Sequence, residues 1–167
     1  SLFGFNTKAL RIEDRFFEIL KTNNLTDGSY ISLSVDAGSN PTYNLIHGVK
    51  AETKIYEKVL INAQKLGKIK EKNFFDLSAA YLVNIHSCSE EDFKNFIIDF
   101  MKAGCNLLRF TFPQQPKGIE TDKGVIPSED EKEKYKVTLQ KLKKQYETDK
   151  CSILIVDADT DHSIYNK

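Results

Sequence analysis

The stretch from Tyr30 to Gly48, YISLSVDAGSNPTYNLIHG, predicts one β-strand that leads through a polar loop into a short helix. Apolar residues at positions 31, 33 and 35 alternate with two serines, which is the period-2 pattern of a strand. Ser39 stands where an N-cap residue is preferred, and a proline follows in the first helical turn. The glycine at the end of the stretch stops the helix. We therefore expect a strand–loop–helix unit here.

The same order of strand and helix repeats along the chain. Strands are predicted at residues 2–6, 30–35, 77–83, 105–112 and 151–156, and helical spacing of apolar residues predicts helices between them. Ser89 and Ser128 each precede a run of acidic residues, which is a capping signal. In the helix that starts near Ile55, Gly67 stands where a left-handed C-terminal residue is preferred. Five strands that alternate with helices predict an α/β fold with a parallel sheet.

The apolar strands and one-sided helices favour a segment of a (β/α) barrel of the TIM type over a doubly wound sheet, with the helices on the outer face. Five parallel strands do not close an eight-stranded barrel, so we expect an open sheet edge. The chain starts without methionine and enters directly as an apolar run. We therefore expect residues 1–167 to be one domain that lacks upstream strands. Those strands of the same protein, or a partner, would cover the open edge.

Composition excludes several classes of partner. Of the 167 residues, 40% are apolar and 29% charged, and 24 basic residues balance 24 acidic ones. A net charge of zero gives no global field that attracts nucleic acid or an anionic membrane. No run approaches the length of a membrane span, no secretory leader opens the chain, and three widely spaced cysteines suit neither a disulfide framework nor a zinc site. We expect a cytoplasmic protein.

Polar residues follow every predicted strand. In parallel sheets and barrels alike, ligands bind beyond the carboxyl ends of the strands, because the loops there meet at one mouth. Each such residue is also well explained as a loop or turn former, but their presence at all five exits favours a binding site. The sequence contains no phosphate loop, nucleophile elbow, paired-histidine motif or close cysteine cluster that would identify a reaction. The candidate site residues are Thr7, Ser34, Asp36, Asn84, Arg109 and Gln114.

Four segments resemble radical S-adenosylmethionine enzymes. Residues 32–48 resemble the family's fourth-strand segment, in which a serine-x-aspartate strand end leads to a threonine-tyrosine helix and a glycine. Residues 7–10, TKAL, are similar to the third-strand exit, with Lys8 in place of the usual asparagine. Residues 77–84 and 104–118 resemble the fifth and sixth strands with their exits. The resemblance covers about residues 2–118, residues 151–157 would be a further strand, and together they imply strands 3 to 7 of a partial TIM barrel.

The resemblance also implies cofactors and residue roles. Members of the family hold a [4Fe-4S] cluster on a CxxxCxxC triplet and cleave S-adenosylmethionine to a 5′-deoxyadenosyl radical. Cys88, Cys105 and Cys151 do not have that spacing, so we expect this chain to be inactive alone. By position, Thr7, Ser34 and Asn84 would bind S-adenosylmethionine. Asp36, Arg109 and Gln114 would face a small-molecule or peptide substrate.

Two other hypotheses remain open. A non-catalytic, barrel-type binding or scaffold domain would keep the shape without the cluster. A phosphate-binding, aldolase-like barrel piece is weaker, because it needs a reactive lysine or a glycine-rich phosphate loop at a strand exit and the chain offers neither. A cysteine triplet upstream would distinguish the radical enzyme from both.

Overall fold

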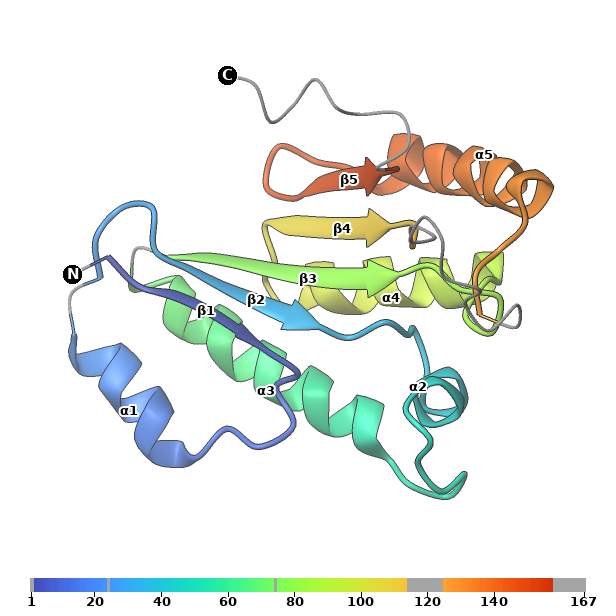
Figure 1. The fold of residues 1–167 in the computed structure, drawn as a ribbon. Coiled ribbons are helices and arrows are strands. Elements are labelled where there is room, and N and C mark those ends of the chain that lie inside the picture. The colour runs from blue at the N-terminus through green and yellow to red at the C-terminus, as the bar shows by residue number, and fades with distance from the viewer. Residues whose placement is uncertain (1, 24, 74, 114–124, 158–167) are drawn as a thin grey trace, which may run out of the picture.

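A computed structural model describes residues 2–23, 25–73, 75–113 and 125–157. It contains one five-stranded sheet with the strand order β1-β2-β3-β4-β5, in which every neighbouring pair is parallel (Figure 1). The elements in chain order are β1 (Gly4–Thr7), α1 (Asp14–Thr22), β2 (Tyr30–Ser34), α2 (Asn40–Ile46), α3 (Ile55–Lys70), β3 (Asp76–Leu82), α4 (Glu90–Lys102), β4 (Leu107–Thr111), α5 (Glu129–Tyr146) and β5 (Ser152–Val156).

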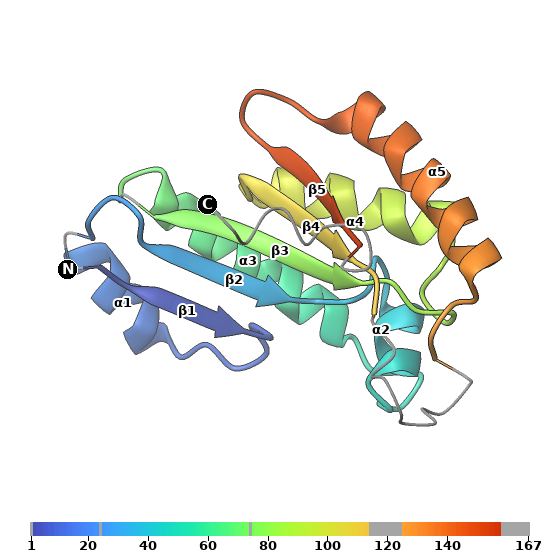
Figure 2. The same ribbon diagram turned by 45° about the horizontal axis from the view of Figure 1, so that its top comes forward.

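The helices lie on one side of the sheet. Figures 1 and 2 show α1, α3, α4 and α5 along the same face, while α2 lies beyond the carboxyl end of β2. Neighbouring helices contact one another in the order α1, α3, α4, α5, which follows the order of the strands. A doubly wound sheet would carry helices on both faces. The α/β class with a parallel, barrel-like but unclosed sheet is thus confirmed.

Three predicted helix starts are confirmed by their caps. The side chains of Ser39, Ser89 and Ser128 accept hydrogen bonds from the backbone N–H groups of Thr42, Asp92 and Glu131, respectively. At Ser128 the glutamate side chain also reaches back to the cap backbone, which completes a capping box. These side chains satisfy amide groups that have no partner within the helix.

Gly67 is a correction to the sequence-based expectation. It does not end its helix; α3 continues to Lys70. A Cβ atom at Gly67 would lie 1.9 Å from the backbone oxygen of Ala103, so the glycine allows α3 to approach the end of α4. Gly104, with φ +90°, does terminate α4. The sequence pattern cannot distinguish a glycine at a helix end from one at a helix contact.

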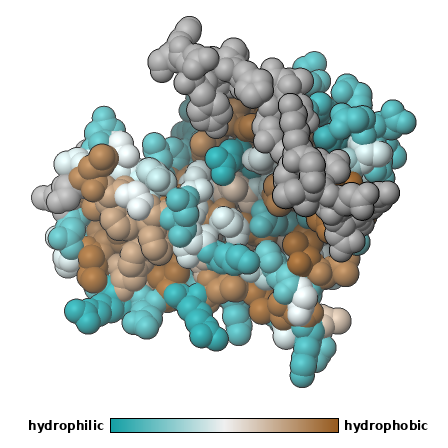
Figure 3. All heavy atoms as spheres, viewed as in Figure 1, coloured by the Kyte–Doolittle hydropathy of each residue, from teal (hydrophilic) through white to brown (hydrophobic). Residues whose placement is uncertain are grey.

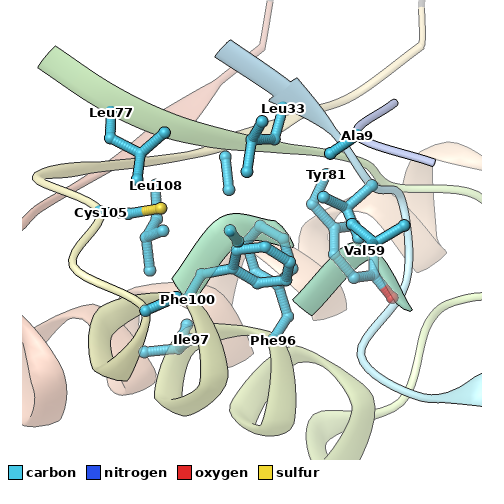
Figure 4. Packing of buried hydrophobic residues seen from close by; sticks show 14 of the residues in the cluster. Ala9, Leu33, Val59, Leu77, Tyr81, Phe96, Ile97, Phe100, Cys105 and Leu108 are labelled. Atoms are coloured by element: carbon cyan, nitrogen blue, oxygen red, sulfur yellow. The ribbon is translucent and has the colours of Figure 1, made fainter. Parts of the chain in front are cut away.

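The core lies between the sheet and the helices. Tyr81 of β3 packs edge-on against Phe93 and Phe96 of α4, with ring centroids 5.4 and 5.1 Å apart. Figure 4 shows Phe96 and Phe100 on α4 pointing toward the sheet, with Leu33, Leu77 and Leu108 above them. These side chains are fully buried, and burying one large apolar side chain contributes roughly 1.5–3 kcal/mol.

The β1 edge exposes apolar side chains. Leu2 is 74% exposed, Phe5 37% and Ile19 of α1 47%. Figure 3 shows hydrophobic side chains gathered at the left of the view, over the start of the chain and β1. A hollow of about 320 Å³ beside them is lined by Phe5, Phe16 and Ile19 together with Arg11 and Arg15.

The described helices are also not membrane spans by length and composition. Across the described residues, none of them combines the length and apolarity that a membrane span requires.

Candidate functional site

The sheet face opposite the helices presents rows of side chains from all five strands. Residues paired in a parallel ladder point to the same face, so the register defines each row. The row nearer the amino ends of the strands contains Asn6, Ser32, Ser78, Leu107 and Ser152. The row nearer the carboxyl ends contains Ser34, Ala80, Arg109 and Leu154.

The centre of this face is built from small side chains. Ser32, Ser34, Ser78 and Ala80 occupy it on β2 and β3, whereas a closed barrel fills its interior with bulky branched residues. Hydroxyl groups are both donors and acceptors, and no hydrogen bond joins these three serine side chains to another described residue. Small polar side chains project only a short way from the sheet, and their hydroxyls, which no other described residue uses, are available to a ligand.

Arg109 stands on the same face as Ser34. Ala80 separates them in the row, and two strand spacings place their backbones about 10 Å apart. Arg109 is exposed, and among the described residues no carboxylate forms an ion pair with it. A guanidinium without a protein partner can bind a carboxylate or phosphate through two parallel hydrogen bonds. The structure therefore brings two of the predicted site residues to one face.

Asp36 lies just beyond the end of β2. It adopts a left-handed conformation with φ +61°, and its Oδ1 accepts a hydrogen bond of 2.8 Å from the backbone N–H of Leu82. Burial raises the pKa of Asp36, while the bond from Leu82 and the nearby charges of His47 and Lys8 oppose that rise. The carboxyl group thus lies between the exits of β1, β2 and β3.

Asp92 of α4 anchors the loop that carries Asp36, which sequence reasoning did not foresee. Its side chain is 5% exposed and accepts bonds from the Gly38 N–H at 2.7 Å and from the Ser39 and Thr42 hydroxyls at 2.9 and 2.8 Å. In the sequence it reads only as the third residue of a helix start. A buried carboxylate with four donors holds this loop in one geometry.

Thr7 does not join Ser34 and Arg109. It pairs with Leu33, whose side chain is buried against the helices, so Thr7 points to the helix-covered face. Phe5, two residues earlier, packs on Phe16 of α1 and sets this alternation. The Thr7 hydroxyl accepts a 3.0 Å bond from the backbone N–H of Ala9 and shapes the turn after β1.

Asn84 is committed to the loop after β3. Its Nδ2 donates to the carbonyl of Leu82 at 3.3 Å, and its Oδ1 accepts from the His86 N–H at 2.9 Å. The residue is 3% exposed. Asn84 therefore shapes the loop after β3, which is the alternative to ligand binding for any polar residue at a strand exit. Gln114 lies outside the described residues.

The cysteines do not fit the ligand set of an iron–sulfur cluster. Cys105 and Cys151 are buried near the amino ends of β4 and β5, at the rim opposite the polar exits. Cys88, in the loop after β3, donates to the Asn84 carbonyl, and burial raises its pKa to about 12. Cluster iron binds thiolates. No cluster of three histidine, cysteine or carboxylate side chains able to hold a metal occurs within the described ranges.

A groove of about 530 Å³ between α1 and α3 lies away from the strand exits. Its floor contains Phe17 and Ile69, and its walls contain Lys21, Lys65 and Lys68 among other charged residues. Lys65 lies 3.7 Å from Asp14 and 5.1 Å from the centre of the Phe17 ring. These contacts describe a solvated outer surface between two helices.

Comparison with solved structures gives a likeness in fold. No family model matches the chain, and no curated protein matches it. The crystal structure of Streptococcus suis SuiB is similar over 92% of this chain, with a TM-score of 0.66 and 11% sequence identity. This chain spans 32% of the SuiB chain. At that identity the likeness shows a shared fold.

Proposed function

We propose that this chain is part of the barrel of a radical S-adenosylmethionine enzyme, and that the helix-free face of its sheet forms a wall of the binding site. The observation that carries the proposal is the floor of small residues, in which the serine hydroxyls and Arg109 have no side-chain partner among the described residues. The singly wound parallel sheet and the resemblance of residues 32–48 support it.

Ser34 and its neighbouring serines would bind uncharged atoms of the cofactor, such as ribose hydroxyls. Arg109 would bind an anionic group of the cofactor or substrate, and Asp36 would order the mouth between them. When bound, S-adenosylmethionine supplies the 5′-deoxyadenosyl group that abstracts hydrogen in such enzymes. The contribution of these side chains is binding and orientation.

The cluster itself would be held by another part of a longer protein. Cys88 lies in the loop after β3, whereas the buried Cys105 and Cys151 lie near the amino ends of the neighbouring strands β4 and β5, at the rim opposite the polar exits. The apolar β1 edge with Leu2 and Phe5 is a surface for preceding strands of the same protein. Free cysteines fit a reducing compartment, so we propose the cytoplasm.

The test uses the full-length gene product that contains this chain, reconstituted without oxygen with iron and sulfide. We expect a charge-transfer absorbance band and, after reduction, release of 5′-deoxyadenosine. The 167-residue chain alone should bind S-adenosylmethionine weakly, because the open iron that anchors the cofactor is not part of it. Absence of 5′-deoxyadenosine from a protein with a filled cluster would remove the radical mechanism.

The second candidate is a barrel-type binding or scaffold domain without redox chemistry. Thr7 and Asn84, which the resemblance assigns to the cofactor, hydrogen-bond to the backbone of the loops after β1 and β3 instead, and this favours the second candidate. It shares the same polar wall, so ligand binding does not separate the two functions. A complete gene product without a cysteine triplet, which still binds a small molecule at Ser34 and Arg109, would establish the second candidate.

A further inference from the structure

The Tyr43 hydroxyl on α2 is buried without a hydrogen-bond partner among the described residues. The residue is 1% exposed, and its ring centroid lies 4.2 Å from that of His47. A buried hydroxyl that makes no hydrogen bond destabilises a fold, and a phenylalanine would fill nearly the same space. The Tyr43 hydroxyl therefore destabilises the fold, and no hydrogen bond to another described residue compensates for this.

The neighbours of Tyr43 belong to the polar exits of β1 and β2. Burial, and after it the negative charge of Asp36, raises the pKa of Tyr43, so the two groups lie within electrostatic range. Only Oδ1 of Asp36 accepts a hydrogen bond, from Leu82, within the described part of the chain. His47 Nε2 lies 3.4 Å from the Val35 carbonyl, directly before Asp36. Lys8 is close enough to act on the Asp36 charge.

Considering only the residues that the structure describes, this cluster has one donor and one acceptor without a partner. The phenol O–H of Tyr43 needs an acceptor, and Asp36 Oδ2 can accept from an N–H or O–H group. Asp36 and Lys8 carry opposite charges, so the cluster does not require a charged ligand. A neutral planar group with an acceptor beside an N–H donor satisfies both atoms.

We propose that Tyr43 and Asp36 form a subsite for such a donor–acceptor edge, of the kind carried by a peptide carboxamide or by a nucleobase. The subsite deepens the proposed function and rests on it, since it assigns ligand chemistry to one part of the same mouth. Tyr43 would donate to the ligand carbonyl or ring nitrogen, and Asp36 Oδ2 would accept from the adjacent N–H group. Occupation would supply the partner that Tyr43 lacks.

Two tyrosine variants of the 167-residue chain test the subsite. Tyr56 provides a matched control, because it is also buried but its hydroxyl donates to Asp99 at 2.9 Å. We expect Tyr43→Phe to keep or raise the melting temperature and Tyr56→Phe to lower it. If Tyr43→Phe lowers the melting temperature as much as Tyr56→Phe does, the hydroxyl has a partner within the fold, such as a trapped water, and the proposal is wrong.

Ligand binding is measured by NMR titration with two probes, N-acetylglycinamide for the peptide source and adenosine for the nucleobase source. We expect one probe to shift the amide resonances of residues 36 and 43. Tyr43→Phe should weaken its binding about tenfold, as for a lost hydrogen bond, while Tyr56→Phe leaves it unchanged. If neither probe shifts these resonances, or both variants bind equally well, the subsite is refuted. Release of 5′-deoxyadenosine from the full-length protein tests the proposed function separately, so the two failures are distinguishable.

Discussion

The Tyr81 hydroxyl of β3 lies 2.6 Å from Oδ2 of the buried Asp92 carboxylate at the start of α4. The same hydroxyl lies 2.5 Å from the carbonyl of Ser87, so its single proton is shared between two acceptors. Burial, together with the Asp92 charge, strongly raises the pKa of Tyr81, which keeps the hydroxyl protonated. Through Asp92 this pair joins the sheet and α4 to residues 38–42, which end the loop after β2 and begin α2.

Asp92→Ala is expected to destabilise the chain by about 3 kcal/mol, because four buried or half-buried donors lose their acceptor. Urea unfolding measures the loss. The matched control is Glu91→Ala, an exposed neighbour on the same helical turn, which should change stability by less than about 0.5 kcal/mol. Equal effects of the two variants would show that Asp92 does not anchor the loop.

Gly38→Ala is expected to cost about 2 kcal/mol or more through forced separation of the loop from α4. A Cβ atom at Gly38 would lie 1.9 Å from the backbone oxygen of Asp92. Gly48→Ala is the control, since nothing lies within 4 Å of its Cβ position and only the positive φ of +62° opposes the side chain, at about 1 kcal/mol. Thermal unfolding that ranks Gly48→Ala as the more damaging variant would contradict the close approach.

Asp36→Asn is expected to stabilise the chain at neutral pH. Burial raises the pKa of Asp36, so its charged form is disfavoured in the fold, and asparagine keeps the Oδ1 acceptor and tolerates the left-handed backbone. The stability that Asp36 contributes falls as pH rises through its folded pKa. The gain of Asp36→Asn should therefore vanish at acid pH, where the native carboxyl is protonated.

Denaturant titrations at several pH values measure this dependence, with Asp27→Asn on an exposed loop as the control. A gain that is independent of pH would mean that the Asp36 charge is not the cause. A loss at neutral pH would mean that the carboxylate is stabilised by a partner in the fold.

The thiol of Cys88 is expected to react slowly with iodoacetamide at neutral pH, because burial raises its pKa to about 12 and little thiolate forms. Mass spectrometry of the labelled chain follows the rate, which should climb as pH increases. Cys88→Ala identifies the signal of this residue. Rapid labelling of Cys88 at neutral pH would reveal an available thiolate and would reopen its role as a metal ligand.

Local sequence signals predicted the fold well because they act over a few residues. The serine caps at Ser39, Ser89 and Ser128 and the terminating Gly104 each follow from backbone groups near them in the chain. The site was predicted less well, since its geometry depends on contacts between distant segments. The anchoring bond from Gly38 to Asp92 spans 54 residues.

The direction of the side chains in the four-residue strand β1 was also not predictable from the sequence. Phe5 turns toward Phe16, which sends Thr7 to the helix side even though Thr7 follows a strand as predicted. Asn84 likewise follows a strand, but its amide is used by the loop. Ser34 and Arg109 do share a face, which the spacing alone could only suggest.

The central claim is that a ligand binds on the helix-free face of the sheet. The most direct test places a larger side chain among the small residues at the centre of that face. Ala80 lies between Ser34 and Arg109, so Ala80→Leu occupies the space that a ligand would need. Gln140→Leu on the exposed side of α5 is the control. In the reconstituted full-length protein, we predict that Ala80→Leu abolishes 5′-deoxyadenosine release while Gln140→Leu retains it. Release from Ala80→Leu at the rate of the unaltered protein, or no release from the unaltered protein, would contradict the account.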